Sequence, residues 1–388
     1  MGNKFMDLGK LLVNSNQIQV MRVLLCPDKF KDSLTAAEVC DALAQGIKKS
    51  HPEAIIQSLP LADGGEGTLD VIREIFGGDW VKVLVKDPLF RPIEAPYLWV
   101  EEGRQAFIEM SRASGIELLT NEERNPALTS TWGTGELILD AINQGAKRIT
   151  LTVGGSATND AGMGMAAALG YRFLDEQGYE LVAIGENLVH IRQIIPSPIE
   201  AKLREIQFQV ATDVRHVLHG PQGAAHVFAK QKGADDDMIR QLDNGLINLS
   251  TFFTNKEIAQ SPGAGAAGGL GAGAMFFLQA SIHLASEWIL DLVSFDQHAA
   301  QADVIISGEG KIDVQSWEGK LISTVIQRSQ VLQKPIILVC GGLQDVNKIP
   351  TSMQHIPVYP ILVPPMSLEE AISQAASHLR RIGENIML

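Results

Sequence analysis

Residues Met21 to Leu59 read MRVLLCPDKFKDSLTAAEVCDALAQGIKKSHPEAIIQSL, and this stretch sets the architecture of the chain. Its first apolar run, Met21 to Cys26, and its last, Ile55 to Leu59, are typical of buried strands. A capping box that begins at Thr35 predicts a helix between them, ending at about Lys49. Two strands joined by a helix form a βαβ unit, in which the strands are parallel and the crossover is right-handed. The loops after both strands are therefore expected at the same edge of a sheet.

Three further apolar runs near the end of the chain extend this pattern. They are Asp303 to Ser307, Pro335 to Cys340 and Val358 to Val363. Such β-branched runs suit parallel strands covered on both faces, and helical stretches at Lys320 to Val331 and Ser367 to Ile382 alternate with them. We therefore predict an α/β fold with a discontinuous, flavodoxin-like, doubly wound parallel-sheet domain made of residues 21–79 and 290–388, in the strand order 2-1-3-4-5.

The middle of the chain, residues 80–289, is expected to form a second, inserted α/β domain. It has its own strand candidates, at Val81 to Val85, Ala106 to Met110, Ile149 to Val153 and Ile206 to Ala211. A chain of 388 residues is long for one core, so its length also favours two domains. Residues 1–20 lack the apolar stretch of a signal peptide and are expected to be an N-terminal extension.

Composition narrows the class of partner. The net charge of −13 argues against nucleic acid or an anionic membrane as a partner, because phosphate groups are bound by basic surfaces. No segment reaches the roughly 18 uninterrupted apolar residues of a membrane-spanning helix. The three cysteines form no disulfide framework, so a reducing, cytoplasmic setting is expected.

Three glycine-rich segments that carry acids follow apolar runs. They are PLADGGEGT (Pro60 to Thr68), TVGGSATNDAGMG (Thr152 to Gly164) and ISGEGKID (Ile306 to Asp313). Each offers bare backbone amides beside carboxylates, which is the combination that a phosphate and a divalent cation require. We expect an enzyme that handles a metal-bound phosphoryl group, although the chain has no GxxxxGK[ST] loop of the P-loop kinases.

The loop PDKFKDS follows the first strand. Asp28 is placed to bind Mg²⁺ or to accept a hydroxyl proton, and Lys29 and Lys31 to neutralise an anionic substrate. The alternative is an Asx turn at Asp28 beside solvated lysines, with Ser33 as an ordinary residue before a helix.

The loop ADGGEGT follows the second strand. Asp63 and Glu66 could hold a cation or orient a polyol, while Gly64 and Gly65 let a ligand approach the backbone. A bare turn closed by a capping threonine would need no ligand.

The stretch from Gly154 to Asp160 is expected to connect the strand RITLTV to a helix made of small residues, AGMGMAAALG. Amides of Gly154, Gly155 and Ser156 and the Thr158 hydroxyl could then contact phosphate at the helix N-terminus, with Asp160 on the metal. Simple helix capping is the alternative.

The last loop has acids and a lysine at alternate positions. Glu309, Lys311 and Asp313 would point one way if the segment is extended, and Lys320 opens the next helix. A surface ion pair, which contributes little, is the alternative.

The motifs also resemble those of a known family. In order, they are PDKFKDSL, LADGGEGT, TWGTGELI, GGSATNDAGMGMAAALG, ATDV, GPQGAAHVFAKQKGA, GAGAAGGLGA and ISGEGKIDVQS. They resemble the bacterial glycerate kinases of type 1, and the likeness spans Met21 to Val363. The resemblance implies ATP- and Mg²⁺-dependent phosphorylation of D-glycerate, usually at the 2-hydroxyl, by a flavodoxin-like domain interrupted by a restriction-enzyme-like domain.

Site residues carried over from the resemblance are the positions that match it. They are Asp28, Lys31, Ser33, Asp63, Glu66, Asp160, Asp213, Glu309 and Asp313. The chain departs from the family where Lys29 replaces serine and Asp32 replaces glycine, and where Arg215 and His216 stand in place of an Asp-Asn pair.

The expected mechanism is in-line phosphoryl transfer in a cleft between the domains. The expected catalytic residues are Asp28, Lys31, Asp63 and Glu66. Phosphate would be bound by Gly154, Gly155, Ser156, Thr158 and Lys320, glycerate by Lys29, Ser33, Gly64 and Gly65, and Mg²⁺ by Asp160, Asp213, Glu309 and Asp313. The competing interpretations are a kinase for another small hydroxy acid or polyol and a non-catalytic regulator that binds a nucleotide or metabolite. The oligomeric state, including a homo-oligomer, stays open.

Overall fold

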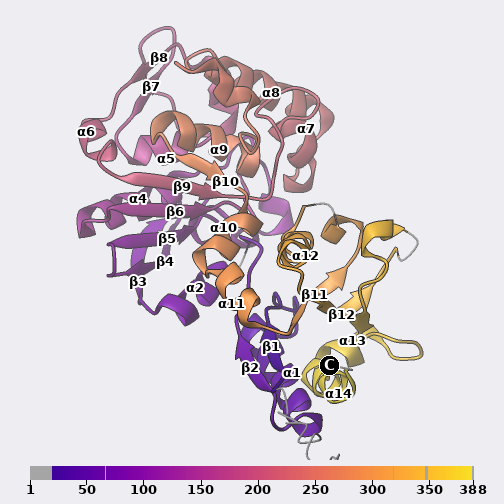
Figure 1. Ribbon diagram of the computed structural model, residues 1–388. Coiled ribbons are helices and arrows are strands. Elements are labelled where there is room, and N and C mark those ends of the chain that lie inside the picture. Colours follow the sequence, from indigo (N-terminus) through magenta and orange to yellow (C-terminus); the bar gives the residue numbers. More distant parts are fainter. Residues whose placement is uncertain (1–19, 66, 318, 346–347, 387–388) are drawn as a thin grey trace, which may run out of the picture.

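The computed structural model describes residues 20–65, 67–317, 319–345 and 348–386 (Figure 1). Two large sheets organise these residues. One has five strands in the order β13-β12-β11-β1-β2, and the other has six in the order β10-β9-β6-β5-β4-β3. A short antiparallel two-stranded sheet, β7 (Arg172–Leu174) and β8 (Gln193–Ile195), completes the strands. Among the described residues, no helix is long and apolar enough to cross a membrane.

The five-stranded sheet is parallel throughout and is built from both ends of the chain. Its strands are β1 (Arg22–Leu25), β2 (Ile55–Ser58), β11 (Val304–Ile312), β12 (Ile336–Leu343) and β13 (Val358–Pro360). β1 lies between β2 and β11, so the predicted flavodoxin-like order 2-1-3-4-5 is confirmed. The chain reverses its direction of winding between β1 and β11, which makes that edge the switch point of the sheet.

Helices cover both faces of this sheet. Val23 and Leu25 of β1 face the cluster that contains α1 (Ala36–Ser50) and α14 (Ala375–Asn385), whereas Leu24 faces α12 (Leu321–Val331). This alternation is the two-residue period of a strand buried on both sides. The predicted capping box is present at the start of α1, where the Thr35 hydroxyl accepts a hydrogen bond from the backbone amide of Glu38 (3.2 Å).

Parallel and antiparallel strands are mixed in the six-stranded sheet. They are β3 (Asp79–Lys86), β4 (Pro92–Val100), β5 (Gln105–Glu109), β6 (Arg148–Thr152), β9 (Gln207–Ala211) and β10 (Ser281–His283). The sequence did not predict β4 because Pro92 and Pro96 interrupt its pattern. Both prolines pair only with β3, since β4 meets β5 only from Leu98 onward, so this part of β4 behaves as an edge strand.

Two predicted elements near the C-terminus differ from the structure. β11 continues past Ser307 to Ile312, so Glu309 and Lys311 lie in a strand and not in a loop. Ser367 to Ile382 is not one helix but two, α13 (Leu368–Ser373) and α14, which are separated at Gln374.

One buried apolar cluster joins the two sheets. It contains Leu24 of β1, Leu98 of β4 and Phe107 of β5, together with Trp288 of α10 (Ala285–Leu292). Figure 1 shows α10 and α11 (Phe295–Gln301) between the sheets. We propose that the sheets are the cores of two domains with the boundaries expected from the sequence, near residues 79 and 289.

Candidate active site

The loop after β1 rests on the end of β11. The Asp28 amide donates to the Gly308 carbonyl (2.8 Å), and a Cβ on Gly310 would come within 3.0 Å of the Lys31 amide nitrogen. Glycine at position 310 therefore lets the loop lie directly on the strand. Asp28 is almost completely buried here, and burial raises the pKa of its carboxyl well above the usual range, with the Asp63 carboxylate adding to the effect.

Four other carboxyls are linked to Asp28, directly or through one another, by the effects of their charges, and Lys320 acts on two of them. We call these residues the acid cluster: Asp28, Asp63, Asp213, Glu309, Asp313 and Lys320. Asp63 links the group, because its charge raises the pKa of Asp28, Asp213 and Glu309. The structure therefore brings together acids from the ends of β1, β2, β9 and β11.

Burial is the main cause of the pKa shifts inside the acid cluster. It raises the pKa of Glu309 to about 7, against the opposing effects of a hydrogen bond with Ser316 and of the Lys320 charge. It raises the pKa of Asp213 to about 6, although Asp213 accepts a hydrogen bond from the Ser286 amide (3.0 Å). Two acids that titrate close to neutral pH are typical of functional sites.

Glu309 also has an oxygen atom without a partner. Its Oε1 is buried and has no hydrogen bond among the described residues. A buried carboxylate oxygen in this state is costly unless a ligand supplies the partner. In the part of the chain that the structure describes, no three acid, histidine or cysteine side chains converge closely enough to hold a metal ion by themselves.

The glycine-rich segment after β6 agrees with its prediction only in part. The predicted helix of small residues is present as α5 (Met163–Ala168), but it begins well after Ser156, so the amides of Gly154 to Ser156 are not at its N-terminus. Instead, Gly155 accepts a hydrogen bond from the Ile116 amide (2.9 Å), and Ser156 pairs with Gly115. Gly154 approaches the loop after β2, since a Cβ added to it would lie 3.3 Å from the Gly65 Cα.

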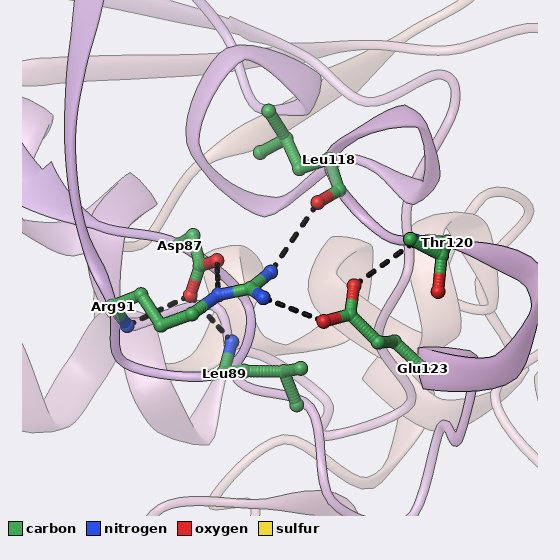
Figure 2. A network of polar contacts seen from close by, with 6 residues as sticks. All are labelled: Asp87, Leu89, Arg91, Leu118, Thr120 and Glu123. Atoms are coloured by element: carbon green, nitrogen blue, oxygen red, sulfur yellow. Dashed lines mark hydrogen bonds and ion pairs between the residues drawn. The ribbon is translucent and has the colours of Figure 1, made fainter.

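A network of charged residues supports the segment on which Gly155 rests. Figure 2 shows Arg91 between Asp87 and Glu123, with a further hydrogen bond to the Leu118 carbonyl (3.4 Å). Leu118 ends the 3₁₀ turn η2 (Ile116–Leu118). The network thus holds the backbone that pairs with Gly155 and Ser156.

Lys232 lies beneath this segment and was not predicted as a site residue. Its Nζ donates to the Ser156 Oγ and to the Thr158 carbonyl, both at 2.7 Å. Only 3% of the residue is exposed, and burial lowers the pKa of its ammonium to about 7, although the Asp160 charge acts in the opposite direction. The Thr158 hydroxyl and the Asn159 side-chain amide beside it are buried without hydrogen bonds among the described residues.

Asp160 is placed differently from the other predicted metal ligands. Its Oδ2 accepts hydrogen bonds from the Thr131 amide, the Thr131 hydroxyl and the Gly164 amide, and its Oδ1 accepts one from the Gly162 amide. It is fully buried within the inserted region. These four donors favour a role in holding the loop, and its metal-binding role stays a prediction.

One hollow includes acid-cluster residues in its wall, and a second is lined by a neighbour of the cluster. The larger, of about 590 Å³, includes Asp28, Asp63 and Glu309 in its wall and is also lined by the predicted residues Lys29, Lys31 and Ser33. The smaller, of about 360 Å³, is lined by Gly154, Gly155, Ser156 and Lys232, with Val214, the neighbour of Asp213.

The other predicted residues fall around these hollows. Lys31 is exposed, and the Ser33 hydroxyl donates to the Ile372 carbonyl of α13 (2.8 Å). Lys29 extends over the loop after β2, with its Nζ 3.8 Å from the point where Gly67 would carry a Cβ. Gly64 and Gly65 lie where that loop meets Ala285 and Gly154. Glu66 lies outside the described residues.

Comparisons with known proteins agree with this arrangement. A model described as the glycerate kinase family matches residues 23–388. A glycerate kinase from Bacillus cereus is 38% identical, with 94% of this chain and 97% of the relative covered, and a glycerate 2-kinase from Escherichia coli is 37% identical with the same coverage. The crystal structure of a candidate glycerate kinase 2 from Salmonella typhimurium is similar, with a TM-score of 0.83 at 36% identity, covering 94% of this chain and 97% of that one.

Proposed function

The chain belongs to the glycerate kinase family, and from this we propose that it phosphorylates D-glycerate at the 2-hydroxyl with ATP and Mg²⁺, giving 2-phosphoglycerate and ADP. The observation that carries the proposal is the acid cluster, where carboxyls with pKa values raised by burial line one hollow, while Val214, next to Asp213 in the chain, lines a second. A phosphoryl transfer between two small molecules needs two binding sites that meet at one charged centre. The three cysteines are buried and unpaired, which supports the expected reducing, cytoplasmic setting.

The donor set of the acid cluster fits Mg²⁺. Asp213, Glu309 and Asp313 offer the hard oxygen ligands that this ion prefers, and the unpartnered Oε1 of Glu309 is available for one. The ion commonly uses only one or two carboxylates and completes its shell with phosphate and water. When bound, it would neutralise charge on the phosphoryl oxygens.

Asp63 is the residue we assign to the attacking hydroxyl. It is exposed at the meeting point of the two sheets, and its Oδ1 is fixed by the Gly65 amide (2.9 Å). The second oxygen is then oriented to accept a hydrogen bond from the substrate. Asp28 lies behind it, and its buried carboxyl favours the neutral form, which reduces the repulsion between the two acids.

Replacing Asp63 tests this role. We expect Asp63→Ala to lower kcat by roughly 10²- to 10⁴-fold, with little change in melting temperature because the side chain is exposed. Asp63→Asn is the matched variant, since it can keep the hydrogen bond to Gly65 but not the basicity. Near-normal turnover by both variants would remove Asp63 from the reaction.

The overall function is tested by ³¹P NMR of the product formed from D-glycerate, ATP and Mg²⁺. A 2-phosphoglycerate signal supports the proposal. A 3-phosphoglycerate signal would preserve the kinase and change the attacked hydroxyl. Absence of product from an enzyme that still binds ATP would favour another hydroxy acid as substrate, for which Lys29, the charged departure from the family, is the first residue to vary.

A further inference from the structure

The larger hollow has two chemically different parts. The polar part of its wall contains Asp28, Asp63 and Glu309 of the acid cluster. The apolar part is formed by two residues that follow β13, by three of α13 and by the first residue of α14: Ile361, Leu362, Leu368, Ala371, Ile372 and Ala375. Lys31 and Lys311 also line the hollow.

The apolar part does not match glycerate. A three-carbon hydroxy acid is polar on every carbon and gains nothing from aliphatic walls, whereas the base and sugar of a nucleotide bury a large, mostly apolar surface. A volume of about 590 Å³ is also within the usual range for sites that hold a ligand of nucleotide size.

The exposure of two aliphatic side chains in the wall indicates that a ligand occupies the larger hollow. Leu368 is 63% exposed and Ile372 is 36% exposed, although both are large aliphatic residues one helical turn apart on α13. They stand at the carboxyl edge of the parallel sheet, next to the switch point between β1 and β11, where open α/β sheets bind ligands. A comparable hollow of about 570 Å³, lined by Tyr171, Phe252 and others, contains neither an acid-cluster residue nor a residue next to one in the chain.

We propose that the apolar part of the larger hollow binds the nucleoside of ATP, with Leu368 and Ile372 against the base. This inference rests on the proposed function. The phosphate chain would then run past the loop after β1 and end at Asp63 and Glu309. The assignment differs from the sequence-based prediction, which gave phosphate to Gly154, Gly155, Ser156 and Thr158.

The smaller hollow is then left for glycerate. Its volume of about 360 Å³ is ample for a three-carbon acid. Lys232 and the Ser156 hydroxyl in its wall can bind a carboxylate, and the contact between Gly154 and Gly65 brings this wall next to Asp63. The two ligands would therefore approach the acid cluster from opposite sheets.

The test is a double variant, Leu368→Ala with Ile372→Ala. Because both side chains are partly exposed, the fold should persist, which thermal unfolding will verify. We expect the KM for ATP and the calorimetric Kd for ADP and for AMP to rise by about tenfold. The KM for D-glycerate should change by less than about twofold. AMP is included because it has the nucleoside but lacks the outer phosphates.

Leu84→Ala with Ile247→Ala is the matched control, because it removes the same two side-chain types from exposed positions outside all the hollows. The KM values for ATP and D-glycerate and the Kd values for ADP and AMP should not change in this control.

Unaltered ADP affinity in the first double variant, in an enzyme that phosphorylates glycerate, would overturn the nucleoside site and leave the proposed function unaffected. Loss of ADP affinity in an enzyme that makes no phosphoglycerate would support the site and overturn the function. A rise in the KM for glycerate alone would place the substrate in the larger hollow and also overturn the inference.

Discussion

Lys232 is the clearest example of a residue whose place in the candidate site could not be predicted from the sequence. It stands in the polar run AKQKGA, where lysines are usually solvated, and its neighbour Lys230 is indeed exposed. The structure buries Lys232 against Ser156 and Thr158, which are far from it in the chain. A contact of this kind depends on tertiary packing, so no local pattern could have predicted it. Asp63 and Glu309, in contrast, were predicted because glycines mark their segments.

Lys232→Met should separate binding of glycerate from binding of ATP. We expect the KM for glycerate to rise by tenfold or more, because the buried ammonium is lost, while the KM for ATP changes by less than about twofold. Lys230→Met is the control, and steady-state kinetics with each substrate varied will measure the difference. A rise in the KM for ATP alone would indicate that this wall of the smaller hollow binds phosphate and not glycerate.

The same residue predicts a pH dependence of stability. The pKa of Lys232 falls to about 7 in the folded chain from an ordinary value of 10.5, so between these values the unfolded state binds more protons. Stability should therefore rise with pH through that window. Thermal unfolding of the ligand-free enzyme at pH 7 and pH 9 should show a smaller rise for Lys232→Met than for the unchanged chain. Equal rises would mean that Lys232 is solvated.

Glu309 and Asp213 should set the acid limb of the rate profile. With pKa values of about 7 and about 6, these carboxyls become protonated as the pH falls through that range, and a protonated carboxyl is a poor cation ligand. At limiting Mg²⁺, kcat/KM should fall between pH 7 and pH 6, and more Mg²⁺ should move the fall to lower pH. An acid limb that does not respond to Mg²⁺ would contradict their role as metal ligands.

At the scale of elements, the sequence predicts best where local signals agree. The strand, capping box and strand of Met21 to Leu59 were predicted within a few residues of β1, α1 and β2. β11 was cut short in the prediction because its glycines resemble a turn. They are needed there because β12 passes close by, so a Cβ on Gly308 would lie 2.0 Å from the Val339 carbonyl oxygen.

The loop after β2 depends on glycine for a similar reason. Gly64 has a φ of 84°, and a Cβ there would lie 2.4 Å from the Cβ of Ala285, the first residue of α10. Gly64→Ala should therefore cost more than the roughly 1–2 kcal/mol of left-handed strain, and should lower kcat/KM by displacing Asp63. Gly178→Ala isolates the strain, because Gly178 has a φ of 82° and open space around it. Equal losses of stability, measured by denaturant unfolding, would show that α10 yields to the new methyl group.

For the whole molecule, the decisive feature is that the candidate active site draws on both sheets. Asp28, Asp63 and Glu309 come from the five-stranded sheet, whereas Asp213 follows β9 of the other. Their spacing therefore depends on how firmly the sheets are held together. The shared apolar cluster provides that hold, and at its centre Trp288 of α10 packs on Phe107 of β5, with ring centroids 6.3 Å apart. An apolar interface of this kind opposes large independent motion of the two parts.

Trp288→Ala should therefore uncouple the sheets. In the unchanged chain we expect one calorimetric unfolding transition, because neither sheet can lose its partner without exposing the shared cluster. Removing the indole costs about 3–5 kcal/mol at a buried site, and the transition should split or broaden as each part unfolds separately. The KM values for ATP and glycerate should both rise, since the hollows lie on opposite sheets.

Trp132→Ala is the control, because Trp132 pairs with Phe90 inside the inserted region, with ring centroids 6.1 Å apart. This replacement should lower the melting temperature without splitting the transition. If the unchanged chain already unfolds in two steps, the cluster does not couple the parts, and the geometry of the acid cluster must depend on the ligands that bridge them.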